Sequence, residues 1–156
     1  MPERVKPVDN FDLQRYLGKW YEIARLDHSF ERGLDNITAE YTLRDDGGVR
    51  VVNRGYSSED GDWRTAEGKA YFVEDPTKGY LKVSFFGPFY GAYVVFDLDP
   101  ENYQYAFVSG PDSDYLWFLS RTPQVSEELL ERFRRESRAL GFDVDQLIYV
   151  KHEQVP

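Results

Sequence analysis

The chain has no cysteine, one methionine and only two histidines in 156 residues. Without cysteine it has no disulfide, no thiolate nucleophile and no Cys-ligated metal. The two histidines, His28 and His152, lie far apart and show no zinc or haem ligand spacing, and they leave no Ser-His-acid set. No glycine-rich phosphate loop is present either. We therefore expect a protein that is not an enzyme and that holds no metal or cofactor.

Basic residues are also outnumbered by acidic ones. The chain has 19 Lys and Arg and 28 Asp and Glu, which gives a formal net charge of -9. Such acidity disfavours nucleic-acid binding, which depends on basic contacts to phosphates. No apolar run approaches the roughly 20 residues of a membrane-spanning helix, and residues 1–7 contain no apolar signal core. The length fits one domain. We expect residues 1–156 to form it, with residues 1–10 as an extended N-terminal arm.

Aromatic residues, by contrast, make up 17% of the chain. Short runs rich in Val, Tyr, Phe and Thr alternate with turn signals such as Asp45-Asp46-Gly47-Gly48, which is typical of an all-β sandwich or barrel. We expect eight strands in a meander, at residues 20–26, 37–44, 48–56, 63–73, 80–86, 91–98, 103–109 and 115–121.

One amphipathic helix is expected after the strands, at residues 126–140. Ser126 can cap its start, Gly141 can end it, and Phe133 lies on its apolar stripe. Two of the expected strands, 91–98 and 103–109, are apolar on both faces. We therefore expect the helix to cover their outer side. The run 147–150 is compatible with one more short strand.

Eight antiparallel strands close into a barrel whose interior holds side chains or one small ligand. The expected inner face of residues 63–73 carries Ala66, Gly68 and Ala70, whose small size leaves room, whereas aromatic residues elsewhere supply apolar walls. We therefore expect a cavity that binds a hydrophobic ligand. Alternation places these residues in its wall: Glu22, Ala24, Ala39, Tyr41, Val51, Asn53, Ala66, Val83, Phe85, Val94, Phe96, Val108, Tyr115 and Trp117.

Glu22 is the charged member of that set. A carboxylate that faces an apolar cavity has a raised pKa unless a partner meets it. Two interpretations remain open. Glu22 either forms a hydrogen bond with an inward polar residue such as Asn53, or it joins Asn53, Tyr41 or Tyr115 in holding the polar group of an amphipathic ligand. No second group for acid-base catalysis is evident.

The segment Gly18-Lys19-Trp20, together with Arg121, resembles the lipocalin signature, in which a Gly-x-Trp on the first strand is matched by an Arg after the eighth. The middle lipocalin motif is reduced to Asp97-Leu98-Asp99. Further segments resemble the lipocalins among bacterial outer-membrane lipoproteins: Asn10-Phe11-Asp12, 27–33, 43–48, 84–91 and Gly110-Pro111-Asp112.

This resemblance implies an eight-stranded antiparallel up-and-down barrel with one C-terminal helix packed outside. It implies storage or transport of a small hydrophobic ligand, a fatty acid or a lysophospholipid, at the periplasmic face of the outer membrane. The chain as given shows no lipoprotein signal and no cysteine that would carry a lipid. Two other functions stay open: a carrier of a flat ligand such as haem or a pigment, and a barrel filled by its own side chains that serves as a protein-interaction module.

Arg121 and Trp20 have a physical interpretation of their own. A guanidinium can stack on an indole and donate hydrogen bonds, and in the family this pair plugs the closed end of the barrel. The alternative is that Arg121 clamps an anionic ligand group.

Three aromatic residues, Phe86, Phe89 and Tyr90, lie in the segment expected to form a loop at the open end. An apolar patch at such a mouth indicates contact with a ligand, a partner or a membrane. The three side chains either fold over the rim as core, form a lip for ligand passage, or contact a second copy in the homodimer that the resemblance implies. His28, in the neighbouring loop 27–36, is either a plain surface residue or one that tunes ligand access with pH.

Overall fold

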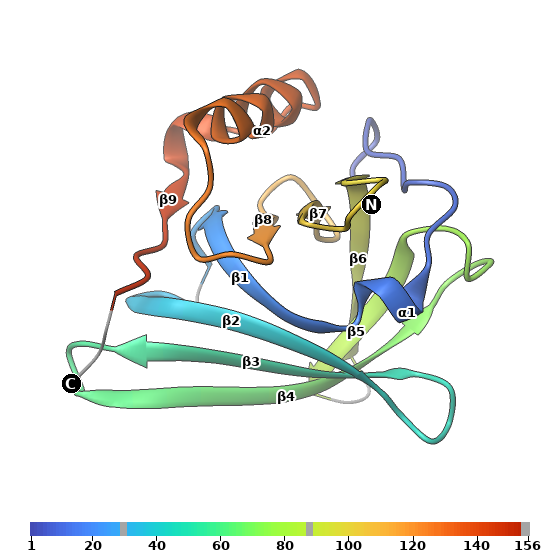
Figure 1. Cartoon of the computed structure of the whole chain (residues 1–156), viewed down its shortest axis with the longest axis horizontal. Helices are drawn as coiled ribbons and strands as arrows, with labels where there is room; N and C mark the ends of the chain where they lie inside the picture. The colour runs from blue at the N-terminus through green and yellow to red at the C-terminus, as the bar shows by residue number, and fades with distance from the viewer. Residues whose placement is uncertain (29–30, 87–88, 154–156) are drawn as a thin grey trace.

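The structure is a computed structural model that describes residues 1–28, 31–86 and 89–153, without the side chains of Phe86 and Phe89. Eight strands follow one another along the chain (Figure 1). They are β1 (Gly18–Arg25), β2 (Leu34–Leu43), β3 (Val49–Ser57), β4 (Asp62–Phe72), β5 (Tyr80–Phe86), β6 (Phe89–Leu98), β7 (Tyr105–Ser109) and β8 (Leu116–Ser120).

Each of these strands pairs antiparallel with the next, and β1 closes the sheet by pairing with both β8 and β2. Helix α2 (Glu127–Ala139) follows β8 and packs outside the barrel. The Ser126 side chain accepts a hydrogen bond from the backbone N–H of Leu129, and Gly141 has φ +97° just after the helix. The predicted up-and-down barrel with one external helix is confirmed.

Two local features differ from the prediction, and a third is the additional short strand that the run 147–150 allowed. Helix α1 (Leu13–Tyr16) precedes the barrel, and at four residues it is too short to leave a periodic pattern in the sequence. Strand β7 begins at Tyr105, because Tyr103 has φ +50° and belongs to the preceding turn. Strand β9 (Ile148–Tyr149), after a 3₁₀ turn at Val144–Gln146, pairs with β1 beyond the barrel.

The N-terminal residues pack against the barrel. Val5 is 1% exposed and belongs to the apolar cluster beneath α2. Val8 lies between two strands: its N–H donates to the carbonyl of Val95 at 2.9 Å, and its carbonyl accepts from Gly79 at 3.0 Å. The arm therefore contributes to the fold by covering part of β6.

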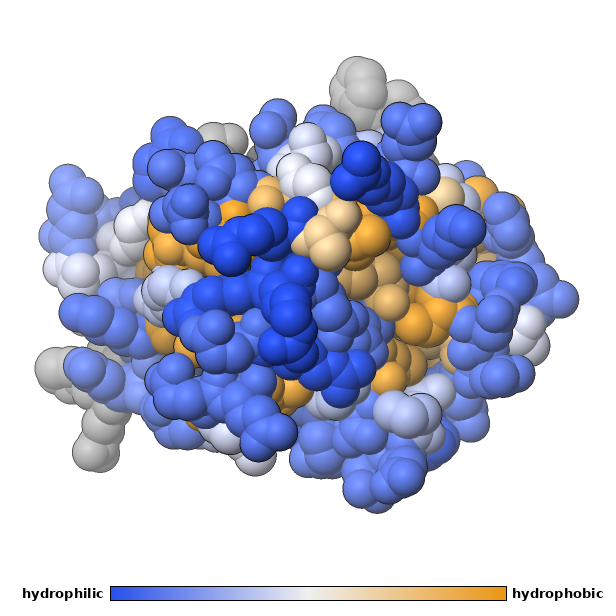
Figure 2. All heavy atoms as spheres, turned by 90° about the horizontal axis from the view of Figure 1, so that it is seen from above, coloured by the Kyte–Doolittle hydropathy of each residue, from blue (hydrophilic) through white to orange (hydrophobic). Residues whose placement is uncertain are grey.

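Apolar side chains form two layers. One fills part of the barrel, and the other lies between the outer face of β6 to β8 and α2. In the outer layer the rings of Phe107 and Phe118 each lie 4.9 Å from the ring of Phe133, centroid to centroid. Seen from the α2 side, hydrophilic side chains cover the middle of the surface and hydrophobic ones show around them (Figure 2). The helix thus covers the strands that are apolar on both faces, as predicted.

Three predicted wall residues, Ala24, Val94 and Phe96, belong to this outer layer, and their expected inward orientation is wrong. In β1 the pairing with β8 shifts between Glu22 and Ala24, so a bulge turns Ala24 away from the interior. In β6 the inward residues are Tyr93 and Val95. Because that run is apolar on both faces, alternation carried no signal that could choose between them.

The closed end of the barrel is built on Trp20 and Arg121. The guanidinium carbon of Arg121 lies 3.8 Å from the centre of the fully buried Trp20 ring. Gly18 has φ +104°, and a Cβ there would lie 3.3 Å from the Arg121 guanidinium, so both conformation and space favour glycine. Arg121 does not line the cavity described below, so its geometry is that of a plug. Arg121 also donates to three backbone carbonyls, those of Arg15 (2.8 Å), Lys19 (3.0 Å) and Tyr103 (3.2 Å).

We expect Arg121→Lys to lower the free energy of unfolding by about 1–3 kcal/mol, because one ammonium group cannot replace a planar fork that serves three carbonyls. Urea unfolding measures the difference. The same exchange at the exposed Arg135 of α2 is the control and should leave stability unchanged. Equal losses in both variants would show that the Arg121 contacts contribute nothing specific.

We expect Phe133→Ala to cost about 3–5 kcal/mol, because it leaves a cavity between the helix and the outer face of the barrel. Arg135→Ala, on the exposed side of the same helix, tests for a general effect of helix substitution. A small loss in Phe133→Ala would mean that the helix contributes little to the stability of the barrel.

Candidate functional site

The barrel encloses a cavity of about 500 Å³, which is within the usual range of small-molecule sites. Most of the predicted wall residues do line it, and apolar side chains dominate the wall. Whether they bind a ligand stays a prediction. The residues whose predicted place in the wall agrees with the structure are Glu22, Ala39, Tyr41, Val51, Asn53, Ala66, Val83, Phe85, Val108, Tyr115 and Trp117.

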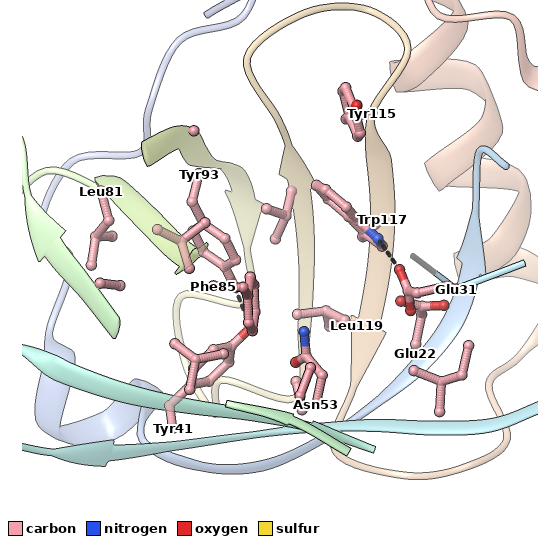
Figure 3. A pocket seen from close by; sticks show the side chains of 18 of the residues that line it. Glu22, Glu31, Tyr41, Asn53, Leu81, Phe85, Tyr93, Tyr115, Trp117 and Leu119 are labelled. Carbon is pink, nitrogen blue, oxygen red and sulfur yellow. Dashed lines mark hydrogen bonds between the residues drawn. The ribbon is translucent and has the colours of Figure 1, made fainter. Parts of the chain in front are cut away.

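Polar side chains gather near the open end of this cavity around Glu31, a residue that the sequence analysis did not select. Glu31 lies in the β1–β2 connection and is 9% exposed. Its Oε1 is 2.5 Å from Nε2 of His28 and accepts a hydrogen bond from the Trp117 indole N–H at 3.0 Å (Figure 3). His28 is thus part of the cavity wall, not a plain surface residue. A single Glu in a polar loop gives no periodic signal, so only folding reveals its burial.

Arg25 supports this group from behind the wall. It is 2% exposed; its Nη1 lies 3.4 Å from Oε2 of Glu22, and its Nη2 donates to the backbone carbonyl of Glu31 at 2.9 Å. Glu22 and Glu31 lie near enough for each carboxyl group to shift the pKa of the other. The side-chain partner of Glu22 is therefore Arg25 and not Asn53, and whether Glu22 and Asn53, which both line the cavity, hold the polar group of a ligand stays a prediction.

The two carboxyl groups have opposite pKa shifts. Burial raises the pKa of Glu22 well above its usual range, and the neighbouring Glu31 carboxylate raises it further. Burial also acts to raise the pKa of Glu31, but hydrogen bonds from His28, Glu22 and Trp117 outweigh it and lower that pKa to about 2. When the pair holds one proton, that proton therefore lies on Glu22, and Glu31 is the ionised member.

Three tyrosines meet at the opposite, closed end of the cavity. The hydroxyl of Tyr93 lies 2.6 Å from that of Tyr16 and 2.8 Å from that of Tyr41. Tyr16 stands against Trp20, with ring centroids 5.0 Å apart. Burial raises the pKa of all three phenols. Tyr16 and Tyr93 were missed from the sequence, because α1 was not predicted and β6 was assigned the opposite face.

At the predicted lip, Tyr90 is 38% exposed and lines the cavity, with its ring centroid 6.3 Å from that of Tyr71. The side chains of Phe86 and Phe89 lie outside the described part of the chain, so their proposed roles in ligand passage or in a homodimer stay predictions. In residues 1–28, 31–86 and 89–153, no cluster of His, Asp and Glu could hold a metal ion. No helix in these ranges is long and apolar enough to cross a membrane.

We expect Glu22→Gln to make the protein less sensitive to alkaline pH. The raised pKa means that the Glu22 contribution to stability is fully present below the unfolded pKa, about 4.3, and is lost as the pH rises through the folded value. The amide stays neutral at every pH, so the Tm of the variant should fall by a few degrees less between about pH 5 and pH 9 than that of the wild type.

Glu31→Gln is the matched control, with the opposite sign. Because the pKa of Glu31 is lowered to about 2, its contribution is present above the unfolded value and lost as the pH falls. This variant should therefore lose stability at neutral pH and approach the wild type in acid. Circular dichroism melts across the pH range measure the Tm of both variants and of the wild type. Parallel pH profiles for the wild type and Glu22→Gln would contradict the assignment of the proton to Glu22.

Comparisons with known proteins agree with this architecture. Residues 11–152 match the family described as the lipocalin-like domain. The chain is 66% identical over 153 residues to the outer membrane lipoprotein Blc of Vibrio cholerae, with 98% of this chain and 90% of the relative covered. It is 57% identical over 150 residues to the outer membrane lipoprotein Blc of Escherichia coli (strain K12), with 96% of this chain and 84% of the relative covered.

Among solved structures, insecticyanin from the tobacco hornworm Manduca sexta has the same fold, with a TM-score of 0.76 at 23% sequence identity. That match covers 96% of this chain and 85% of insecticyanin. The family match and the two bacterial relatives extend over nearly the whole chain, and the barrel with its cavity is what such a match predicts. The protein therefore belongs to the lipocalin family, whose members bind small hydrophobic ligands.

Proposed function

We propose that the protein binds one long-chain fatty acid or lysophospholipid in the barrel cavity and so stores or transports it. The observation that carries this proposal is the cavity of about 500 Å³ with largely apolar walls and a mouth at the open end of the barrel. Tyr41, Phe85 and Val108 are among the residues that present apolar surface to it. The shape suits one flexible apolar chain whose polar group stays near the mouth.

The free energy of such binding comes from burial of the chain. Each methylene removed from water contributes about 0.8 kcal/mol, so about 14 methylenes contribute about 11 kcal/mol. Lost translational and rotational freedom costs at least about 4 kcal/mol. The remaining free energy is at most about 7 kcal/mol, which corresponds to a Kd of about 10 µM or weaker before any polar contact is counted.

The mouth offers groups of both signs to the polar end of an amphiphile. The ionised Glu31 lines the cavity on one side, and Arg64 lines it from β4, where the Arg64 side chain is 62% exposed and forms an ion pair with Asp60. A zwitterionic head group would find an opposite charge for each of its own charges here. This favours the lysophospholipid between the two ligand classes.

The relatives indicate where the protein acts. The two Blc proteins of Vibrio cholerae and Escherichia coli are named as outer membrane lipoproteins. We extend that location to this protein as part of the proposal, with the lipid taken up and released at the periplasmic face of the outer membrane. A homodimer belongs to the same proposal.

Native mass spectrometry of the protein purified from cells tests the ligand and the homodimer together. A bound phospholipid fragment or fatty acid supports lipid carriage, and the mass of the complex gives the oligomeric state.

Titration with haem and with a fatty acid, read by quenching of Trp117 in the cavity wall, compares the two ligand classes. Saturable haem binding without any response to acyl chains would favour the flat-ligand carrier. A protein that takes up neither would favour the interaction module.

We expect Ala66→Trp to weaken lipid binding about tenfold, because the indole would displace at least about two methylenes from the cavity, worth about 1.6 kcal/mol. Ala66 lines the cavity on β4, whereas Ala139 is exposed at the end of α2. Ala139→Trp therefore adds the same side chain outside the site and should leave the Kd unchanged. Unaltered lipid affinity in Ala66→Trp would contradict a ligand that lies along β4.

A further inference from the structure

Tyr16, Tyr41 and Tyr93 form the floor of the cavity, here called the tyrosine floor. If the cavity held only an apolar chain, the hydroxyl groups of these residues would have no function there. The three side chains come from α1, β2 and β6, so the fold brings together residues that are distant in sequence. All three line the cavity, and Tyr16 and Tyr41 are only 3% and 6% exposed. Three hydroxyl groups in the deepest part of an apolar cavity need hydrogen-bond partners.

The protons of the tyrosine floor outnumber its internal hydrogen bonds. Each phenol carries one proton, and burial raises the pKa of each, so all three protons are present at neutral pH. Two hydrogen bonds connect the hydroxyls, both through Tyr93. Within the described residues, Tyr16 and Tyr41 have no other side-chain acceptor for their hydroxyl groups. One O–H donor therefore remains without an acceptor from the chain, whichever way the other two bonds are oriented.

The charges around the cavity make the floor a better site for an acceptor than the mouth. Arg121 lies behind Trp20, on which Tyr16 packs, and its positive charge acts on the Tyr16 and Tyr41 hydroxyls. At the mouth the ionised Glu31 is the dominant buried acceptor and disfavours an oxygen with negative charge beside it, whereas Arg64, a cation at the mouth, is 62% exposed and already paired with Asp60. The mouth of the cavity thus favours hydrogen-bond donors of a ligand, and the floor offers a hydrogen-bond donor to the ligand.

We propose that the tyrosine floor is a second ligand subsite, which binds a hydrogen-bond-accepting oxygen at the buried end of a long-chain ligand. This rests on the proposed function, because it assumes that an acyl chain fills the cavity above the floor. Two sources supply such an oxygen: a hydroxyl group at the far end of an acyl chain whose carboxyl stays at the mouth, or the carboxyl of a fatty acid that enters carboxyl first.

The first test compares hexadecanoic acid with 16-hydroxyhexadecanoic acid, using displacement of a fluorescent fatty acid. If the far end of the chain reaches the floor, the hydroxy acid should bind roughly fivefold more tightly, which is the factor expected of one net hydrogen bond. In water the hydroxyl only makes the chain more polar, so an apolar floor would give the opposite order. Failure of both acids to bind would count against the proposed function, whereas equal or weaker binding of the hydroxy acid counts against a far-end oxygen.

The second test determines at which end of the cavity the carboxyl group of the fatty acid lies. Trp20 stands next to the tyrosine floor and Trp117 lies near the mouth, so they report on opposite ends of the cavity. With Trp63→Phe to remove the third indole, the variant Trp63→Phe/Trp117→Phe reports Trp20 alone. Quenching of Trp20 by 2-bromohexadecanoic acid would identify the carboxyl as the buried oxygen. The absence of a cysteine excludes alkylation of a thiol by this reagent.

The third test removes the donors. The triple variant Tyr16→Phe/Tyr41→Phe/Tyr93→Phe replaces all three hydroxyls at once, so no buried polar group is left half-paired and folding should be preserved. If a far-end hydroxyl is the bound oxygen, this variant should bind the unsubstituted acid at least as well as the wild type and lose the preference for the hydroxy acid. If the carboxyl is the bound oxygen, the variant should bind the unsubstituted acid more weakly than the wild type. Tyr115→Phe makes the same change at the mouth and should keep that preference.

The first test, on the wild type, and the second, on Trp63→Phe/Trp117→Phe, stand even if the triple variant does not fold. The proposal is overturned if the wild type shows no preference for the hydroxy acid and 2-bromohexadecanoic acid fails to quench Trp20. It is also overturned if the folded triple variant keeps the full wild-type preference.

Discussion

Strand β1 carries the constraint on which the rest of the structure depends, because it must close the barrel against two different neighbours. Its first residues pair with β2, and from Tyr21 onward it pairs with β8. The bulge after Glu22 accommodates this change of partner, and it leaves Glu22 facing inward while Ala24 turns out to the layer beneath α2. Beyond Tyr21, β1 and β2 no longer pair. The β1–β2 connection, which carries Glu31, contributes to the cavity wall in that region.

The cavity is polar at its two ends and apolar between them. At the mouth, the hydrogen bonds from His28 and Trp117 allow Glu31 to stay ionised in a buried position, while burial raises the pKa of Glu22. At the floor, hydroxyl groups replace charges. A ligand that fills this space must place its methylenes along the wall between the two ends, because apolar side chains dominate that part of the cavity.

The aromatic residues that dominate the composition divide among these regions. Trp20 supports the closed end, Tyr41 and Trp117 belong to the cavity wall, and Phe133 joins the helix to the barrel. Their planar rings serve different purposes in each place: stacking under a guanidinium, apolar surface with a polar tip, and dense packing between layers. The high aromatic content follows from a protein that must build two apolar layers and a cavity within 156 residues.

The resemblance to the lipocalin signature pointed to the pairing of Trp20 with Arg121, and the amino-acid sequence by itself determined the strand order, the external helix and most of the cavity wall. These features depend on alternation, capping residues and turns, which are local. Only the tertiary structure decided the inward face of β6, the outward turn of Ala24, the buried Glu31 and the tyrosine floor. A bulge changes the parity of a strand without a mark in the sequence, a strand that is apolar on both faces has no preferred side, and a polar loop residue becomes buried only when distant segments close around it.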